Sequence, residues 1–294
     1  MEITPYTWPI AEATVEGWLA KKLGPDVIHE LDLAVKGGSA LCELIFKYRP
    51  CAHLDTGASN RPCVDLILLT AISIVNGASK MYRERREGTS AGGAVGALEH
   101  DHGNEHRARM HLKMLKLLYE VPVEYHDKIM GRQYSGRMDW ALSYMGQLAS
   151  GQACAFNDIS KGAGYRTLLA VIEAKGAEPN SRASAQLLAY LGCLYRDRGA
   201  RRTREDISAF GATTDGLSWR FFMLDQEGAS GDVESQRAYV PVRESREYNI
   251  SRRGELRIVL GMIMYILQRG MGLIVPPAGG EDDSTIVGLI GGPL

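Results

Sequence analysis

The stretch Thr167–Gly176 reads TLLAVIEAKG, an apolar run that ends in two charges. Because side chains of a strand alternate between its two faces, the run is apolar on both faces until Glu173 and Lys175. That pattern predicts a central strand that is covered on both sides. A carboxylate and an ammonium there are costly to desolvate unless they are paired, hydrogen-bonded or bound to a metal. Taken alone, the two charges are best interpreted as an ion pair at the strand exit.

The composition is that of an ordinary globular protein, with 45% hydrophobic and 23% charged residues among 294. The formal net charge of −1 gives no global electrostatic case for nucleic acid, so any such contact must come from local patches. Five dispersed cysteines without a CxxC pair are typical of reduced thiols, which favours a cytoplasmic or nuclear protein.

No membrane partner is expected from the sequence. The N-terminus lacks the basic and apolar regions of a signal peptide. The longest apolar run, Leu66–Val75, is short and contains Ser and Thr, so it does not predict a membrane span.

Residues 1–95 are expected to form a helical N-terminal region. The pattern predicts helices over 11–23, over 40–48 with Ser39 as the cap, and over 63–85. Gly24-Pro25 is a good stop signal for the first of these helices. Residues 88–97 are glycine-rich and lack the Gly-Lys-Ser/Thr of a phosphate-binding loop, so they are interpreted as a linker.

Residues 96–275 are expected to form an α+β core, followed by a loosely held tail over 276–294. Asn104 is a plausible cap for a helix over 105–119. Pro122 predicts an edge strand over 121–125, and Thr214-Asp215-Gly216 predicts a hairpin. Met138, Trp140 and Leu142 are expected on one strand face. The remaining predicted elements are strands over 136–144, 167–175, 207–213, 217–224 and 237–242, and helices over 181–198 and 252–268.

Two alternative sites are disfavoured by the sequence. Asp55-Thr56-Gly57 suggests an aspartic protease, but the tripeptide has no second copy and its surroundings look helical. The histidines at 100, 102, 106 and 111 suggest a zinc protein, but their spacing is not a standard zinc pattern and no cysteine is near in sequence. A polar helix-entry segment is the better interpretation of the histidine cluster.

Four short motifs follow one another on elements of matching type. They are GRMD at 136–139, EAK at 173–175, QLLAY at 186–190 and TDGLSW at 214–219. Together they resemble the fungal-type members of the PD-(D/E)xK nuclease superfamily, over roughly residues 100–270. The resemblance implies a restriction-endonuclease-like mixed sheet flanked by helices, and metal-dependent hydrolysis of phosphodiester bonds in nucleic acid, with DNA favoured over RNA.

The resemblance also implies a set of site residues. Metal ions that hydrolyse phosphodiesters are hard cations that prefer oxygen ligands, so Mg2+ or Mn2+ is the expected cofactor. Asp139, Glu173 and the backbone carbonyl of Ala174 would bind it. Lys175 would orient or deprotonate the attacking water, or stabilise charge in the transition state.

The superfamily often carries a further glutamate on its first helix. Glu105 matches that position and Glu99 is the reserve candidate, although a carboxylate in a first helical turn also suits the helix dipole. Gln186 would face the site from the next helix, with Tyr190 one turn beyond it. A polar edge on an otherwise apolar helix explains both residues nearly as well.

Arg137, two residues before Asp139, is the expected contact for a substrate phosphate, together with Tyr190. A second basic group could serve phosphates or the helix C-terminus equally well. It comprises Arg196, Arg198, Arg201, Arg202 and Arg204. The alternative to an enzyme is a catalytically silent nuclease-like fold that binds nucleic acid or protein. Oligomeric state stays open.

Overall fold

The computed structural model describes residues 6–7, 12–37, 39–48, 57–90, 114–127, 131–145, 168–174, 181–201, 207–224 and 242–271. Within these ranges the chain is an α+β protein, as predicted. Glu99, Glu105, Lys175, the four histidines, most of the glycine-rich linker and the tail lie outside the described residues. Glu173 is described through its backbone alone.

The helices predicted over 11–23 and 40–48 are confirmed, whereas the helix predicted over 63–85 extends from 57 to 90, into the expected linker, and the helix over 25–35 was not predicted. Four helices make up the described N-terminal region. They are α1 (Glu12–Leu23), α2 (Pro25–Val35), α3 (Ala40–Tyr48) and α4 (Gly57–Ser90). Gly24 has a φ of 86°, which lets the chain turn between α1 and α2. The Ser39 hydroxyl accepts a hydrogen bond from the Cys42 backbone N–H at 3.2 Å and caps α3.

Eight described strands form one mixed sheet in the order β1-β7-β6-β5-β4-β3-β2, with β8 paired to β6. Strand β3 is antiparallel to both of its neighbours, β2 and β4, whereas β5 is parallel to β4. The connection from β4 to β5 contains helix α6 (Ser181–Arg201). The strands are β1 (Tyr6–Thr7), β2 (Met114–Asp127), β3 (Arg132–Met145), β4 (Leu168–Ala174), β5 (Ala209–Thr214), β6 (Ser218–Leu224), β7 (Val242–Glu244) and β8 (Tyr248–Asn249).

Strand β4 is the predicted central strand and lies between β3 and β5. Its Ile172 side chain is 2% exposed. The predicted edge position of residues 121–125 is also confirmed, because β2 ends the described sheet. Pro122 has no N–H to donate to a neighbouring strand, and an edge strand tolerates this because one of its sides has no pairing partner.

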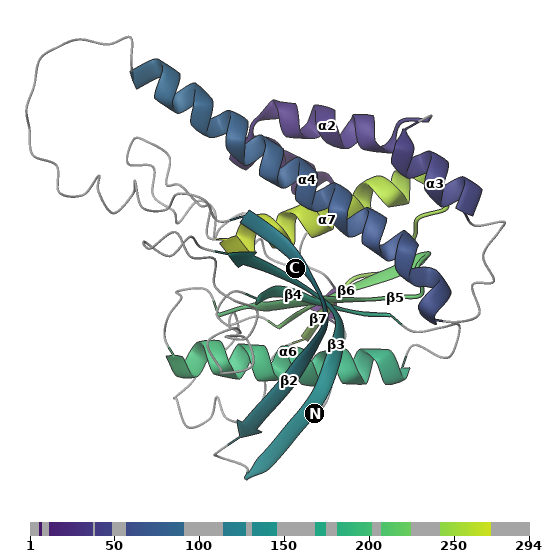
Figure 1. The fold of residues 1–294 in the computed structure, drawn as a ribbon, viewed down its shortest axis with the longest axis vertical. Helices are drawn as coiled ribbons and strands as arrows, with labels where there is room; N and C mark the ends of the chain where they lie inside the picture. Colours follow the sequence, from purple (N-terminus) through teal and green to yellow (C-terminus); the bar gives the residue numbers. More distant parts are fainter. Residues whose placement is uncertain are drawn as a thin grey trace, which may run out of the picture.

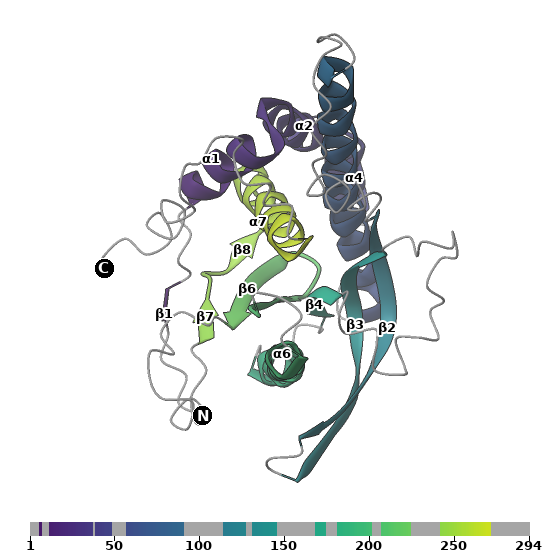
Figure 2. The same ribbon diagram turned by 90° about the vertical axis from the view of Figure 1, so that its left-hand side faces the viewer.

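Helices cover both faces of the sheet. Helix α6 lies on one face, and α4 and α7 (Arg253–Met271) lie on the other with α1 and α2 outside them (Figure 1). The end-on view shows α6 alone beneath the sheet, with the long β2–β3 ribbon extending past it (Figure 2). Two separate apolar cores result, one for each face.

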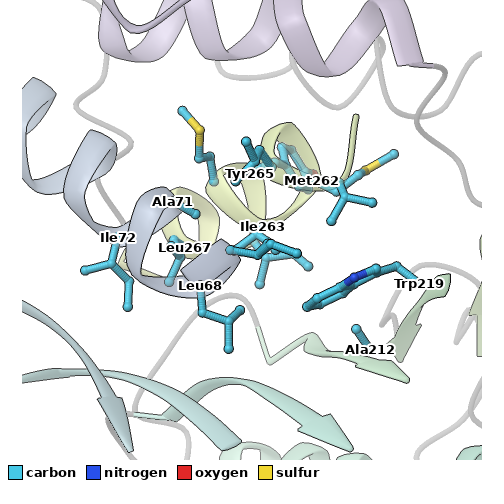
Figure 3. Close-up of a cluster of buried hydrophobic side chains, with 14 of the residues drawn as sticks. Leu68, Ala71, Ile72, Ala212, Trp219, Met262, Ile263, Tyr265 and Leu267 are labelled. Carbon is cyan, nitrogen blue, oxygen red and sulfur yellow. The ribbon is translucent and has the colours of Figure 1, made fainter. Parts of the chain in front are cut away.

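The larger core lies between α4, α7 and the sheet. Figure 3 shows Leu68, Ala71 and Ile72 of α4 next to Ile263 and Leu267 of α7, above Trp219 and Ala212 of the sheet. Residues of α1, α2 and α3 pack against the same core. By length and composition alone, Arg61–Ala78 of α4 could cross a membrane, but 44% of this stretch is buried inside the protein and core helices pass the same test.

The helix predicted over 105–119 is wrong for residues 114–119, which belong to β2. These residues pair with β3 from Met114↔Met145 to Tyr119↔Trp140. Leu115 and Leu117 fit a strand face as well as Leu117 and Leu118 fit a helical stripe, so the local pattern is ambiguous. The pairing of β2 with β3 selects the strand over the helix. That pairing depends on β3 residues, which lie outside the segment predicted to be a helix.

The single apolar face predicted for the 136–144 strand is also wrong. Trp140 and Leu142 belong to the core under α4 and α7, but Met138 belongs to the core under α6. Between Met138 and Trp140, the side chains of alternate residues therefore change from one face of the sheet to the other. The regular pairing of β2 with β3 is interrupted at the same place, between Tyr119↔Trp140 and Val121↔Met138, where Glu120 has a φ of 49°. Period-two alternation assumes a strand without such an interruption.

Two smaller predictions differ at their ends. Helix α6 continues to Arg201, past the expected stop at Gly199. The strand predicted over 237–242 has only Val242 in common with β7, and 237–241 lie outside the described residues. The hairpin of β5 and β6 and the closing helix α7 occur where they were predicted.

Adjacent leucines on α4 test the packing of the larger core. Leu68 is 0% exposed and Leu69 is 50% exposed. Leu68→Ala is expected to lower the free energy of unfolding by about 2–5 kcal/mol, because it leaves a cavity against α7. Leu69→Ala is expected to change it by less than about 0.5 kcal/mol. Urea denaturation followed by circular dichroism measures both, and equal effects would contradict this packing.

Candidate functional site

The two predicted carboxylates lie at neighbouring positions on adjacent strands. Strands β3 and β4 pair antiparallel up to Trp140↔Ile172. Asp139 and Glu173 are the next residue on each strand, one step beyond that last pair. On the other side of β4, Glu173 pairs with Thr213 and Ala174 with Thr214 of β5. The backbone therefore brings Asp139, in the middle of β3, next to Glu173 and the Ala174 carbonyl at the C-terminal end of β4.

A tyrosine on α6 fixes the strand just before Asp139. The Tyr190 hydroxyl donates to the Arg137 carbonyl at 3.1 Å and accepts from the Arg137 backbone N–H at 3.0 Å. It also accepts from Gln186 Nε2 at 2.9 Å. These bonds use the one proton and both lone pairs of a hydroxyl. Tyr190 therefore holds the β3 backbone, and Gln186 orients Tyr190.

Gly136 is the residue that makes this contact possible. A Cβ added at Gly136 would lie 2.4 Å from Tyr190 Oη, which is far inside van der Waals contact. The GRMD and QLLAY motifs are thus two halves of one joint between β3 and α6. Of the residues in that joint, Arg137 lies nearest to Asp139 in the chain and its side chain is exposed.

Helix α4 holds the strand just after Asp139. Trp140 Nε1 donates to Asp65 Oδ1 at 2.7 Å, and the Arg61 guanidinium lies over the Trp140 ring, 5.6 Å from its centroid. Burial raises the pKa of Tyr119, as do the charge of Asp65 and the hydrogen bond to it. Asp65 is thus a carboxylate of α4, the helix before β2, beside the strand that carries Asp139; Glu105 lies outside the described residues.

Glu120 sits between two guanidinium groups beside Asp139. Its Oε1 accepts from Arg61 Nη1 at 3.1 Å, and its Oε2 accepts from Arg137 Nη1 at 3.1 Å. Arg61 Nη2 is also 3.9 Å from Asp139 Oδ1. The hydrogen bond from Arg61 is the main cause that lowers the pKa of Glu120, with the charge of Arg61 and the contacts of Arg137 adding to it.

Sequence reasoning missed Arg61, Asp65 and Glu120. Asp65 had a detectable signal, because it is the only charged residue in the apolar stretch Cys63–Val75. Glu120 had none, since a glutamate between a tyrosine and a valine is unremarkable. Its backbone is unusual only in three dimensions: φ is 49°, and it is the only described non-glycine residue with positive φ.

The described contacts of the fourth motif, TDGLSW at 214–219, stabilise the fold. Asp215 Oδ1 accepts from the backbone N–H groups of Leu217 and Ser218, at 2.9 and 2.6 Å, and closes the β5–β6 turn. Gly216 has a φ of 91°, which the turn requires. Trp219 is fully buried in the larger core.

Burial, with the charge of Asp215 adding to it, raises the pKa of the Cys63 thiol to about 11, so that thiol is not a reactive nucleophile.

The predicted basic group is only partly a surface patch. Arg198 is 3% exposed and its guanidinium donates to the Ser208 carbonyl, which ties α6 to the chain entering β5. Arg202 and Arg204 lie outside the described residues. Among the described side chains, no group of three or more His, Cys, Asp and Glu is close enough to hold a metal. That search does not include the Glu173 side chain.

No protein-family model matches this chain, and no curated protein matches it significantly.

Gly136→Ala tests the joint between β3 and α6. The added methyl group is expected to lower the free energy of unfolding by about 1–3 kcal/mol, because neither the strand nor the buried tyrosine can move freely. In a Tyr190→Phe background, the same substitution should cost at least about 0.5 kcal/mol less, because the clashing oxygen is gone. Denaturant unfolding of the four proteins measures this coupling.

Gly192→Ala is the matched control for that experiment. Gly192 lies on α6 with nothing within 4 Å of an added Cβ, so alanine should stabilise the helix by up to about 1 kcal/mol. Additive effects of Gly136→Ala and Tyr190→Phe would show that the two residues do not meet as described.

Proposed function

We propose that this protein is a metal-dependent nuclease that hydrolyses phosphodiester bonds, with DNA as the favoured substrate. The observation that carries the proposal is the pairing register: Asp139 on β3 and Glu173 on β4 follow the last paired residues of two adjacent strands. Two carboxylates at neighbouring positions on adjacent strands are costly unless a cation or a hydrogen-bond network compensates them.

The order of elements supports the same proposal. The series α4, β2, β3, β4, α6, β5 has an antiparallel β2–β3–β4 meander and a β5 parallel to β4. A mixed sheet with helices on both faces is what the resemblance to the PD-(D/E)xK superfamily implies. The contact between Tyr190 and the Gly136-Arg137 backbone gives two of the four motifs a shared physical role.

The donor set fits a hard divalent cation. Asp139, Glu173 and the Ala174 carbonyl all offer oxygen atoms, which Mg2+ and Mn2+ prefer, and Asp139 is half-buried. A bound cation of this kind would polarise the phosphate and lower the pKa of a water molecule. Lys175, the next residue along from Ala174, would orient or deprotonate that water.

The residues around these ligands take supporting roles. Arg137 would contact a substrate phosphate, since its guanidinium is exposed and its backbone is fixed by Tyr190. Tyr190 and Gln186 would act as positioning residues, because the hydroxyl of Tyr190 is fully used in holding β3. Asp65, a carboxylate on the helix before β2, would orient Trp140 next to Asp139, and Glu105 stays a predicted metal ligand.

One observation favours a catalytically silent binding module as the second candidate. The Arg61 guanidinium lies 3.9 Å from Asp139 Oδ1 and balances part of the charge that a cation would need. Calorimetric titration with Mn2+ separates the candidates. A nuclease should bind Mn2+ and lose that binding in Glu173→Ala, whereas a silent module should show the same weak binding in both proteins.

Loss of activity in site variants is the direct test. Asp139→Asn, Glu173→Gln and Lys175→Ala should each reduce the cleavage of plasmid DNA in Mg2+ or Mn2+ by at least about a hundredfold, because each removes a charge that acts on the transition state. Agarose-gel assays of strand cleavage, with and without EDTA, measure the rates.

Asp32→Asn is the control variant. Asp32 is an exposed carboxylate on α2 that pairs with Arg257, so its loss should leave cleavage unchanged. Cleavage that survives both Asp139→Asn and Lys175→Ala would rule out this site.

A further inference from the structure

Glu120 is held in a backbone conformation that glutamate rarely adopts. Its φ of 49° lies in the left-handed region, which residues other than glycine, asparagine and aspartate rarely adopt. The position is next to Asp139 on the neighbouring strand, at the point where the β2–β3 ribbon changes face. Local strain of this kind is found often at functional sites, and the ion pairs to Arg61 and Arg137 help to offset it.

The geometry of this contact resembles that of a bound phosphodiester. Each carboxylate oxygen of Glu120 accepts from a different arginine, both at 3.1 Å. A phosphodiester carries one negative charge on two non-bridging oxygens and can accept from two guanidinium groups in the same way. The exposed fractions of Arg61, Glu120 and Arg137 are 41%, 45% and 66%, so a substrate can reach all three.

The two arginines come from separate elements that converge only here. Arg61 lies at the start of α4, where its guanidinium also contacts the Trp140 ring. Arg137 lies on β3, whose backbone is fixed by Tyr190 at that very residue. Both guanidinium groups are therefore preorganised beside Asp139, which lowers the entropic cost of binding an anion.

We propose that Glu120 is an internal substitute for a substrate phosphate, and that DNA displaces it to bind Arg61 and Arg137 as a two-armed phosphate clamp. The inference rests on the proposed function, because it takes DNA as the ligand of the site. In the free protein Glu120 neutralises the clamp; in the complex the phosphate next to the scissile bond takes its place.

Binding of a fluorescein-labelled DNA duplex in EDTA tests the clamp without any cleavage. Glu120→Gln should bind the duplex about two- to tenfold more tightly than the unmodified protein, because the competing anion is gone. Replacing both Arg61 and Arg137 by glutamine should make the slope of log K against log salt concentration shallower by about 0.9, the value for one phosphate contact. Fluorescence anisotropy over a series of salt concentrations measures both.

The chain offers a matched control at the other end of the sheet. Glu247 is 44% exposed and pairs with Arg220 at 3.1 Å, so Glu247→Gln removes a similarly exposed charge from an ion pair far from Asp139. Arg220→Gln is the corresponding arginine control. Both should leave affinity and salt slope near those of the unmodified protein. Thermal unfolding of each variant checks that the fold is intact.

The outcomes separate this inference from the proposed function. If Glu120→Gln binds no more tightly than Glu247→Gln, or if no duplex binds at all, the clamp is wrong. If the clamp variants behave as expected but no metal-dependent cleavage is found, the clamp stands and the nuclease proposal fails. If cleavage depends on Asp139 but not on Arg61 and Arg137, the nuclease proposal stands alone.

Discussion

The hydroxyl of Tyr190 is where helix α6 and strand β3 are joined, and the geometry around Asp139 depends on that joint. One buried hydroxyl binds both the N–H and the carbonyl of Arg137. A β-ribbon as long as β2–β3 twists strongly, and its free end has only one neighbour for each strand. Without an anchor, the position of Asp139 relative to β4 would vary with that twist. The anchor works because Gly136 leaves room for the phenol oxygen.

Helix α4 holds the opposite side of the same strand. Asp65 accepts from the Trp140 indole, and Arg61 packs over its ring, so the residues before and after Asp139 are fixed from different layers of the protein. Asp139 therefore lies where β3 passes from one core to the other. This location explains how a half-buried carboxylate can stay near solvent while the backbone on both sides is rigid. A polar site on a strand is held in one geometry when packing on both faces of the sheet fixes that strand.

Much of the fold follows from local signals that are short and strong. The strand over 168–174 is apolar on both faces, Thr214-Asp215-Gly216 has the residues a tight turn requires, and Gly24-Pro25 separates two helices. The failures share one cause. The pairing of residues 114–119, the change of face at Met138 and the ion pairs of Glu120 all depend on the partner strand or on α4, up to 59 residues away in the chain. Asp139 was identified from a motif, and Asp65 is recognisable in the sequence as a lone charge in an apolar stretch, but Arg61 became recognisable only when α4 was seen against β3.

The charges of this region also bear on the near-neutral composition of the chain. A net charge of −1 argues against a protein that attracts a polyanion over long distances. It does not argue against one that binds a phosphate at short range by exchange. Arg61 and Arg137 are balanced by Glu120 and Asp139, so the region is close to neutral as a whole. A phosphate that displaces the Glu120 carboxylate meets two oriented guanidinium groups, while the displaced carboxylate turns to solvent, where its charge is screened. Under the proposed function, specificity for a phosphodiester would then come from geometry beside Asp139, and the salt dependence of binding would be shallow.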